Sequence, residues 1–279
     1  SAQPSYTYYI RVRGWSGYGT YSLELSIISQ NDAGSGGDAG DNLDTAMSVN
    51  VGTYLGFIKD DDSNDCYRTI QNVTAGQGLY VRVTPTSSLA VDIRLYDEAR
   101  VEKVYEWGYD GVIVTAGARA TTTGIFYIKI HSWSGYGNYT MTISIEPSVG
   151  VPTHKPQTPI GGQAVKVSVS VTAVLKGVGN VVLSYSTNAG VSWTEVAMSR
   201  NATTGLYEGT IPGFPVGTNV YYKITAYNTV GDFYVEDKGG LHYVYTVIPE
   251  FPLSLLLPTF MILSLLATIL AKKKLGKRP

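Results

Sequence analysis

FYIKIHSWSGYGNYTMTISI, residues 126–145, consists of two alternating runs on either side of the pentapeptide WSGYG. Before the pentapeptide, Ile128 and Ile130 alternate with polar residues. After it, Met141 and Ile143 alternate with threonine and serine. Side chains two residues apart point to the same face of a strand, so each run buries one face. The stretch therefore predicts a β-hairpin whose connecting loop is WSGYG, with glycine where a positive φ is needed.

The same pattern occurs near the start of the sequence. YYIRVRGWSGYGTYSLELSI, residues 8–27, aligns with residues 126–145 and has apolar residues at the equivalent positions. We interpret the two stretches as the closing edges of two copies of one domain. Residues 30–147 then form a complete copy, and residues 1–29 form the C-terminal hairpin of an upstream copy whose beginning is absent.

The composition favours an all-β protein. The chain has 279 residues, only 15% of them charged, with 22 tyrosines and 31 glycines. Aromatic and β-branched residues suit pleated strands, and glycine suits tight turns. Five of the 21 basic residues and none of the 22 acidic residues follow Glu250, which leaves the preceding part acidic. An acidic body argues against nucleic acid as a partner and mildly for cations.

A second domain is expected after a linker. Proline and glycine accumulate without periodicity over residues 148–162. Residues 163–247 then begin with valines that alternate with polar residues, which predicts a half-buried strand. The segment VVLSYSTNAGVSWTEVAM predicts a hairpin that turns at residues 188–190, with Trp193 on its return strand.

The C-terminal region, residues 248–279, predicts a membrane anchor. Residues 251–271 carry no charge and are long enough, at about 1.5 Å per residue, to cross a hydrocarbon core of roughly 30 Å. Basic residues from Lys272 to Arg278 follow and favour the cytoplasmic side. We therefore expect one transmembrane helix, with everything before Phe251 outside the cell.

A short motif stands directly before this apolar stretch. Pro249, Glu250 and Phe251 precede it, and basic residues follow it. This arrangement resembles the PEF-type C-terminal sorting signal of archaeal surface proteins. The resemblance implies an archaeosortase-like transpeptidase as a partner, which would cut near the tripeptide. A retained helix that simply anchors the protein is the alternative.

Three sequons support export to the cell surface. Asn72, Asn138 and Asn201 each stand two residues before threonine, in the pattern of N-glycosylation acceptors. Cys66 is the single cysteine, so the chain cannot form an internal disulfide. We interpret Cys66 as a small buried apolar residue.

Residues 30–147 resemble the bacterial pre-peptidase C-terminal domain. The resemblance is carried by NDAGSGGDAGDNLDTA at residues 31–46, DDDSNDCYRTIQNVTAGQGLYVRV at 60–83, VDIRLYDE at 91–98 and GIFYIKIHSWSGYGNYTMTI at 124–143. It implies a jelly-roll-like β-sandwich of the kind found behind secreted peptidases and in surface proteins.

The second domain resembles a different family. GLYEGTIPG, residues 205–213, and VGTNVYYKITAYNTVGD, residues 216–232, are similar to fibronectin type III or related immunoglobulin-like domains. The resemblance implies a second β-sandwich that serves as a spacer or an adhesive module. The expected fold is thus a pair of tandem β-sandwiches followed by one transmembrane helix.

Acidic loops are the candidate metal site. Asp60, Asp62 and Asp65 lie close together in sequence, and Asp32 stands on a glycine-rich segment that also carries Asp38, Asp41 and Asp44. Calcium takes six to eight oxygen ligands from flexible, carboxylate-rich loops. Relatives with collagen-binding activity hold calcium in the corresponding regions, so the resemblance implies Asp32, Asp62 and Asp65 as ligands. The other interpretation is that these residues are solvated turn residues and strand caps.

Exposed aromatic residues are the second candidate site. Trp133 and Tyr136, with Trp15 and Tyr18 in the first copy, are suited to form a stacking platform for polysaccharide or for another surface protein. The other interpretation is that they cover the end of a sandwich.

No catalytic motif is recognised in the sequence. The three histidines do not have metalloprotease spacing. We therefore expect a non-enzymatic, membrane-anchored archaeal surface protein whose β-sandwiches serve as spacer or adhesion units. The alternative is the non-catalytic C-terminal stalk of a secreted subtilisin-like protease or another hydrolase.

Overall fold

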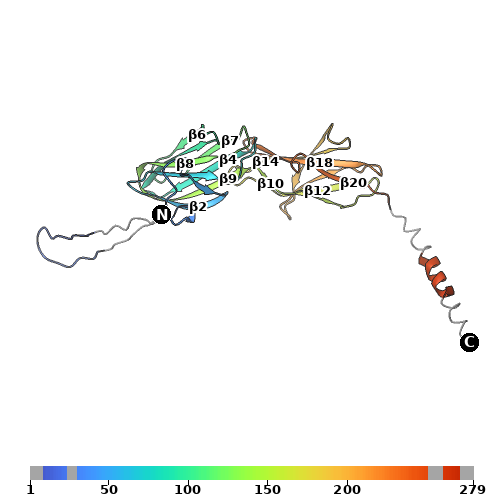
Figure 1. The fold of residues 1–279 in the computed structure, drawn as a ribbon, viewed down its shortest axis with the longest axis horizontal. Helices are drawn as coiled ribbons and strands as arrows, with labels where there is room; N and C mark the ends of the chain where they lie inside the picture. Colours follow the sequence, from blue (N-terminus) through green and yellow to red (C-terminus); the bar gives the residue numbers. More distant parts are fainter. Residues whose placement is uncertain (1–8, 24–29, 251–259, 271–279) are drawn as a thin grey trace, which may run out of the picture.

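The structure, a computed structural model, describes residues 9–23, 30–250 and 260–270. Two β-sandwiches follow one another along the chain (Figure 1). The prediction of an all-β architecture is confirmed, because strands make up most of the regular structure in the described residues.

The first sandwich consists of a five-stranded and a four-stranded sheet, preceded by the short 3-10 helix η1 (Asp32–Gly34). In spatial order the five-stranded sheet contains β1 (Met47–Val49), β3 (Asn64–Thr69), β8 (Tyr127–Gly135), β5 (Leu89–Tyr96) and β6 (Glu102–Trp107). In spatial order the four-stranded sheet contains β2 (Gly52–Ile58), β9 (Gly137–Glu146), β4 (Gly78–Pro85) and β7 (Val114–Arg119). Within these two sheets β1 and β3 are parallel, and the other neighbours are antiparallel.

The predicted hairpin over residues 126–145 is wrong. β8 pairs with β3 and β5, whereas β9 pairs with β2 and β4, so the chain crosses from one sheet to the other at Tyr136. Alternation cannot separate the two arrangements, because strands of opposite sheets also bury one face each. Gly135 has φ 72°, and a Cβ there would overlap the carbonyl oxygen of Ser88. Glycine therefore permits this crossing.

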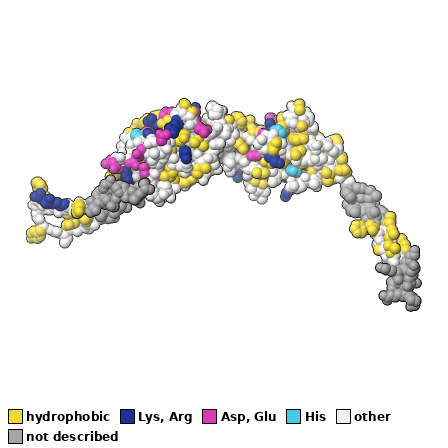
Figure 2. Space-filling view, in the orientation of Figure 1, with side chains coloured by type: hydrophobic (Ala, Val, Ile, Leu, Met, Phe, Trp, Pro, Cys, Tyr) yellow, Lys and Arg dark blue, Asp and Glu magenta, His cyan; other side chains and the backbone are white. Residues whose placement is uncertain are grey.

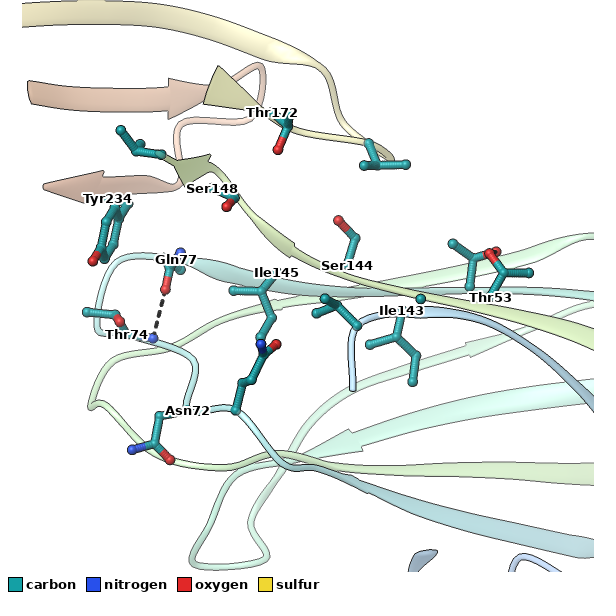
Figure 3. A pocket seen from close by; sticks show the side chains of 16 residues that line it. Thr53, Asn72, Thr74, Gln77, Ile143, Ser144, Ile145, Ser148, Thr172 and Tyr234 are labelled. Carbon is teal, nitrogen blue, oxygen red and sulfur yellow. Dashed lines mark hydrogen bonds between the residues drawn. The ribbon is translucent and has the colours of Figure 1, made fainter. Parts of the chain in front are cut away.

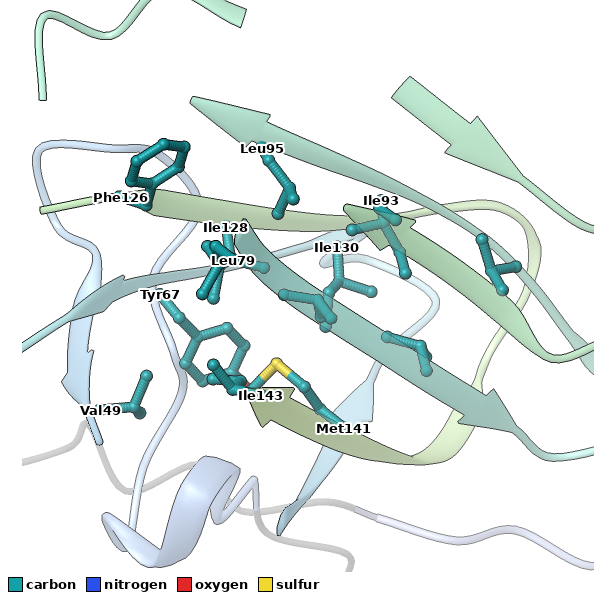
Figure 4. Packing of buried hydrophobic residues seen from close by; sticks show 14 of the residues in the cluster. Val49, Tyr67, Leu79, Ile93, Leu95, Phe126, Ile128, Ile130, Met141 and Ile143 are labelled. Atoms are coloured by element: carbon teal, nitrogen blue, oxygen red, sulfur yellow. The ribbon is translucent and has the colours of Figure 1, made fainter. Parts of the chain in front are cut away.

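The core of the first sandwich lies between its two sheets (Figure 4). Tyr67, Leu79, Ile93, Ile128 and Met141 are fully buried in it. Burial of each large apolar side chain contributes about 1.5–3 kcal/mol, so this interior is the main source of the sandwich's stability.

The first copy of the repeat differs from the second. Residues 9–23 contain no strand, and the Trp15 side chain is 95% exposed. In the second copy, the hydroxyl of Ser88 donates to the carbonyl oxygen of Tyr136 at 3.3 Å, and β8 and β9 are paired on both sides. The same pentapeptide thus has a regular structure only where neighbouring strands surround it.

The second sandwich also has two main sheets. In spatial order one contains β11 (Thr153–Lys155), β12 (Val165–Val169), β17 (Tyr207–Ile211) and β16 (Ser199–Arg200). The other contains β15 (Thr194–Ala197), β14 (Val178–Ser186), β18 (Asn219–Asn228) and β19 (Phe233–Glu236), with β20 (Tyr243–Thr246) also paired to β18. A small two-stranded sheet joins β10 (Ser148–Val149) to β13 (Val171–Thr172).

Two sequence predictions in this sandwich are confirmed. The alternating valines of β12 are buried in its core. β14 and β15 form the predicted antiparallel hairpin, whose turn contains Ala189 and Gly190 at positive φ. Trp193, which was predicted on the return strand, lies directly before it.

The segment expected to be a linker, residues 148–162, contains two strands. β10 pairs with β13, and β11 pairs with β12. Both pairings attach the segment to the second sandwich.

The expected transmembrane helix is corrected by the structure. Within the predicted span, residues 260–270 are helical, which corresponds to about 16 Å at 1.5 Å per residue. Among the residues that the structure describes, none of the helices has both the length and the apolar character needed to cross a bilayer. Residues 251–259 and 271 of the predicted span lie outside the described residues.

The two sandwiches contact each other directly through Asp232, in the turn between β18 and β19. Its side chain is buried and accepts hydrogen bonds from the Tyr80 hydroxyl, from Arg119 Nε at 2.5 Å and from Asn228 Nδ2 at 3.0 Å. Tyr80 and Arg119 belong to the first sandwich, whereas Asn228 belongs to the second. Asp232 therefore ties the two sandwiches together.

The buried carboxylate of Glu146, at the end of β9, makes a second connection. It accepts backbone N–H groups of the second sandwich, from Leu175 at 2.5 Å and from Lys176 at 3.0 Å. The carboxylates of Asp232 and Glu146 thus each accept hydrogen bonds across the junction between the two sandwiches.

Candidate functional site

Asp32, in η1, positions the glycine-rich segment against β2. Its side chain is fully buried. Oδ1 accepts the backbone N–H of Phe57 at 2.7 Å, and Oδ2 accepts that of Ala39 at 3.2 Å. These bonds bring the following aspartates to the end of the sandwich.

Asp65, near the start of β3, is also fully buried. The Tyr139 hydroxyl donates to Asp65 Oδ2 at 2.5 Å, and the Tyr67 hydroxyl lies 2.6 Å from that of Tyr139. Asp65 Oδ1 is buried and has no hydrogen-bond partner among the described residues. An unpartnered buried carboxylate oxygen is unusual, because most buried polar atoms are hydrogen-bonded.

The structure brings the aspartates into two groups that share one member. Oxygen atoms of Asp32, Asp38 and Asp65 lie within 4.8 Å of one another. Oxygen atoms of Asp38, Asp41 and Asp62 do so as well. We call these five residues the acidic cluster. Figure 2 shows acidic side chains gathered at the N-terminal end of the first sandwich.

No lysine, arginine or histidine in the described part of the chain forms an ion pair with the acidic cluster. Burial raises the pKa of Asp65 to about 8 and that of Asp32 to about 6. The pKa of Asp38 is also raised by burial, and that of Asp41 is raised chiefly by its hydrogen bond with Asp62. The surroundings of the cluster therefore disfavour the ionisation of all its carboxylates at once.

The sequence predicted part of this cluster. Asp32 and Asp65 lie in one group and Asp62 in the other, but Asp60 is exposed and lies in neither. The sequence places Asp38 and Asp41 on the glycine-rich segment but does not predict them as ligands. The backbone N–H of Cys66 donates to the carbonyl oxygen of Gly40 at 2.9 Å, which brings their segment next to β3. No local sequence pattern predicts this long-range contact.

The donor set fits a hard cation. Five carboxylates offer oxygen ligands, and Asn64 adds a buried Oδ1 that has no partner among the described residues. Calcium and magnesium prefer oxygen ligands, and calcium accepts the irregular geometry of flexible loops. If calcium is bound, Asp32, Asp38 and Asp65 would hold it at the buried group, and Asp38, Asp41 and Asp62 at the outer group.

Trp133 lies near the end of β8 and Tyr136 lies at the crossing between the two sheets, and they are 45% and 58% exposed. Trp133 Nε1 donates to the carbonyl oxygen of Gly108 at 3.1 Å. Its ring forms edge contacts with Trp107 and Tyr109, at centroid distances of 6.3 and 5.9 Å. The aromatic patch is thus formed by Trp107, Tyr109 and Trp133, and packing holds it while leaving much of it exposed.

Sequence reasoning missed Trp107 and Tyr109. Trp107 ends β6 and Tyr109 follows it by two residues, far from the repeated pentapeptide in the sequence, although the tripeptide Trp-Gly-Tyr in EWGYDG was a visible signal. Trp15 and Tyr18 are highly exposed within residues 9–23.

The predicted modification sites differ in accessibility. Asn72 and Asn138 are exposed, whereas Asn201 is half-buried and its side chain bonds to Glu208. Pro249 and Glu250 are exposed, and Phe251 lies outside the described residues.

Cys66 is fully buried, as expected from the sequence. Burial raises the pKa of its thiol to about 12.

Comparisons with known proteins give only distant similarities. No family model matches the chain, and no curated protein matches it. The pre-peptidase C-terminal domain of a collagenase from Bacillus anthracis is 17% identical with a TM-score of 0.31, over 35% of this chain and 93% of that domain.

Two larger proteins are similar over more of this chain. A β-glucuronidase from Bacteroides uniformis is 10% identical with a TM-score of 0.25, over 71% of this chain and 27% of the enzyme. A DUF4785 family protein from Legionella pneumophila is 11% identical with a TM-score of 0.29, over 72% of this chain and 64% of that protein. This chain spans less than two thirds of either protein. These similarities assign no family and no activity.

Proposed function

We propose that the chain is a non-catalytic part of an exported protein, in which two joined β-sandwiches form a spacer or adhesion unit stabilised by calcium. The observation that carries the calcium proposal is Asp65 Oδ1, which is buried without a partner beside the carboxylates of Asp32 and Asp38.

The physical argument concerns repulsion between neighbouring carboxylates. Negative charges a few ångströms apart repel strongly where water is excluded. A bound proton relieves the repulsion, which agrees with the raised pKa of Asp65. A calcium ion relieves it better at neutral pH, because its two charges interact with several carboxylates at once.

The position of the acidic cluster supports a stiffening role. Asp32 bonds to the backbone of β2, and Asp65 belongs to β3 of the other sheet. A cation held between them would connect the glycine-rich segment to both sheets. Asp232 and Glu146 connect the opposite end of this sandwich to the next one. Together these contacts favour a rigid unit over a flexible chain of modules.

The aromatic patch supports the adhesive part of the proposal. Trp107 and Tyr109 are 51% and 64% exposed beside the half-exposed Trp133. Large exposed aromatic residues are common at contact surfaces, because they offer apolar area at a low entropic cost. Polysaccharide or another surface protein remains the proposed partner of this patch.

The calcium proposal is tested by calorimetric titration of the full chain at pH 7.5. We expect saturable calcium binding by the wild type and loss of the buried site, seen as a lower stoichiometry, in Asp65→Asn. The matched control is Asp60→Asn, because Asp60 is exposed and lies outside both groups. Equal binding by the wild type and Asp65→Asn would refute the assignment, as would absence of binding by the wild type.

A further inference from the structure

A groove of about 600 Å³ lies at the junction of the two sandwiches (Figure 3). Thr53, Ser144 and Ile145 line it from the first sandwich. Thr172 and Tyr234 line it from the second. None of the 16 lining residues is charged.

The chemistry of this lining suits a sugar. Hydroxyl and amide side chains alternate with small apolar surfaces, and no charge is present to select an ion. Sugars likewise present hydroxyl groups beside apolar C–H faces. Ligand sites commonly combine apolar surface with a few polar groups that fix orientation, and they occur at domain junctions.

The walls of the groove are held in place by direct bonds between the sandwiches. The Phe233 N–H of the second sandwich donates to the carbonyl oxygen of Gly76 in the first at 2.9 Å. Within the first sandwich, Gln77 Nε2 donates to the carbonyl oxygen of Pro147 at 2.8 Å and fixes the start of the connection. Asp232 lies next to Phe233 and binds Arg119. A groove formed before its ligand arrives loses less entropy on binding.

Asn72 places a covalent attachment point in this lining. It is exposed, its side chain makes no hydrogen bond with the described residues, and Thr74 completes its sequon. In Figure 3, Asn72 and Thr74 lie on the loop of the first sandwich, across from Tyr234 and Thr172. Asn138 is exposed but does not line the groove.

We infer that an N-linked glycan on Asn72 occupies the groove and stabilises the junction of the two sandwiches. This inference rests on the proposed export of the protein. Nδ2 of Asn72 forms a bond to the anomeric carbon of a lipid-linked oligosaccharide donor. The bond from that carbon to the lipid phosphate oxygen breaks, and the amide proton leaves with the phosphate. Attachment at the rim keeps the glycan at a high effective concentration in the groove.

The test uses the full chain secreted from a eukaryotic cell line that modifies N-X-T sequons during export. Peptide mapping by mass spectrometry should find a glycan on Asn72. Amides of residues 142–149 and 171–174 should exchange hydrogen at least about threefold more slowly in the wild type than in Asn72→Gln. Thr74→Ala also prevents modification but retains Asn72, so it should behave like Asn72→Gln.

Asn138→Gln is the matched control and should leave exchange in these segments unchanged. An unmodified Asn72 overturns the inference whatever the state of Asn138, and so does equal exchange in wild type and Asn72→Gln. Calcium binding is measured on the same preparations. If calcium binding is retained together with either of these results, the glycan inference is refuted and the calcium proposal is not.

Discussion

The two ends of the first sandwich bury carboxylates in different ways. At the junction, Asp232 is 3% exposed and has three side-chain donors, which include an arginine. At the acidic cluster, Asp65 is 0% exposed and has one donor, Tyr139, with Oδ1 left unpartnered. A carboxylate with a complete set of partners joins two parts of a structure. One that keeps a free oxygen beside other carboxylates is suited to bind a cation.

The largest effect on the free energy of unfolding is expected from a substitution at the junction of the two sandwiches. Asp232→Ala leaves Tyr80 and Arg119 without their acceptor, and unsatisfied buried partners are costly. We expect a loss of about 3 kcal/mol in the free energy of unfolding, measured by chemical denaturation in the presence of a calcium chelator. A loss below about 0.5 kcal/mol would mean that the junction is not held by this carboxylate.

At the acidic cluster, removal of negative charge should stabilise the folded protein, whereas removal of the Asp232 charge should destabilise it. The pKa of Asp65 in the folded protein is about 8, above its ordinary value of 3.8, because burial disfavours the charged form. Protonation therefore stabilises the folded state fully below about pH 4, and this contribution is lost as the pH rises to about 8.

We expect the calcium-free protein to lose on the order of 2 kcal/mol between pH 5 and pH 8.5. Denaturation in chelator at several pH values measures this. A rise in stability over the same interval would contradict the account.

The sequence predicted the strands better than their pairing. Alternation located β8 and β9 through Ile128, Ile130, Met141 and Ile143, because one face of each strand is buried. It could not show that the strands belong to opposite sheets, since that depends on what lies beside them.

The sequence likewise could not predict which distant residues meet at the acidic cluster and at the junction. Three of the predicted aspartates lie in the acidic cluster, but Asp38 and Asp41 join them through a backbone contact that no local pattern reveals. Asp232 acquires its role only when the two sandwiches meet.

Replacing Asp65 by asparagine should have a smaller effect, with a sign opposite to that of Asp232→Ala. In chelator at pH 9, Asp65→Asn should be about 1 kcal/mol more stable than the wild type, because it removes one charge from the cluster. The variant should also flatten the pH dependence described above. Denaturation curves of both proteins test this, and a strongly destabilised variant would show that the Asp65 charge has a partner.

The smallest effect is expected for Arg119→Lys. Lysine keeps the positive charge next to Asp232 but loses the planar guanidinium geometry, and the Arg119 side chain is 47% exposed. We expect a loss below about 1 kcal/mol. Arg119→Met removes the charge and should cost more. Equal stability of both variants would show that the charge of Arg119 does not contribute.

The most direct test of the central claim is the melting temperature of the full chain as free calcium is increased. A ligand that binds only the folded state stabilises it by RT ln(1 + [L]/Kd), or about 2.7 kcal/mol at a hundredfold excess over Kd. The melting temperature of the wild type should rise with the logarithm of calcium at pH 8, and that of Asp65→Asn, which lacks the buried site, should rise less. Coincident wild-type melting curves in chelator and in millimolar calcium would contradict the claim.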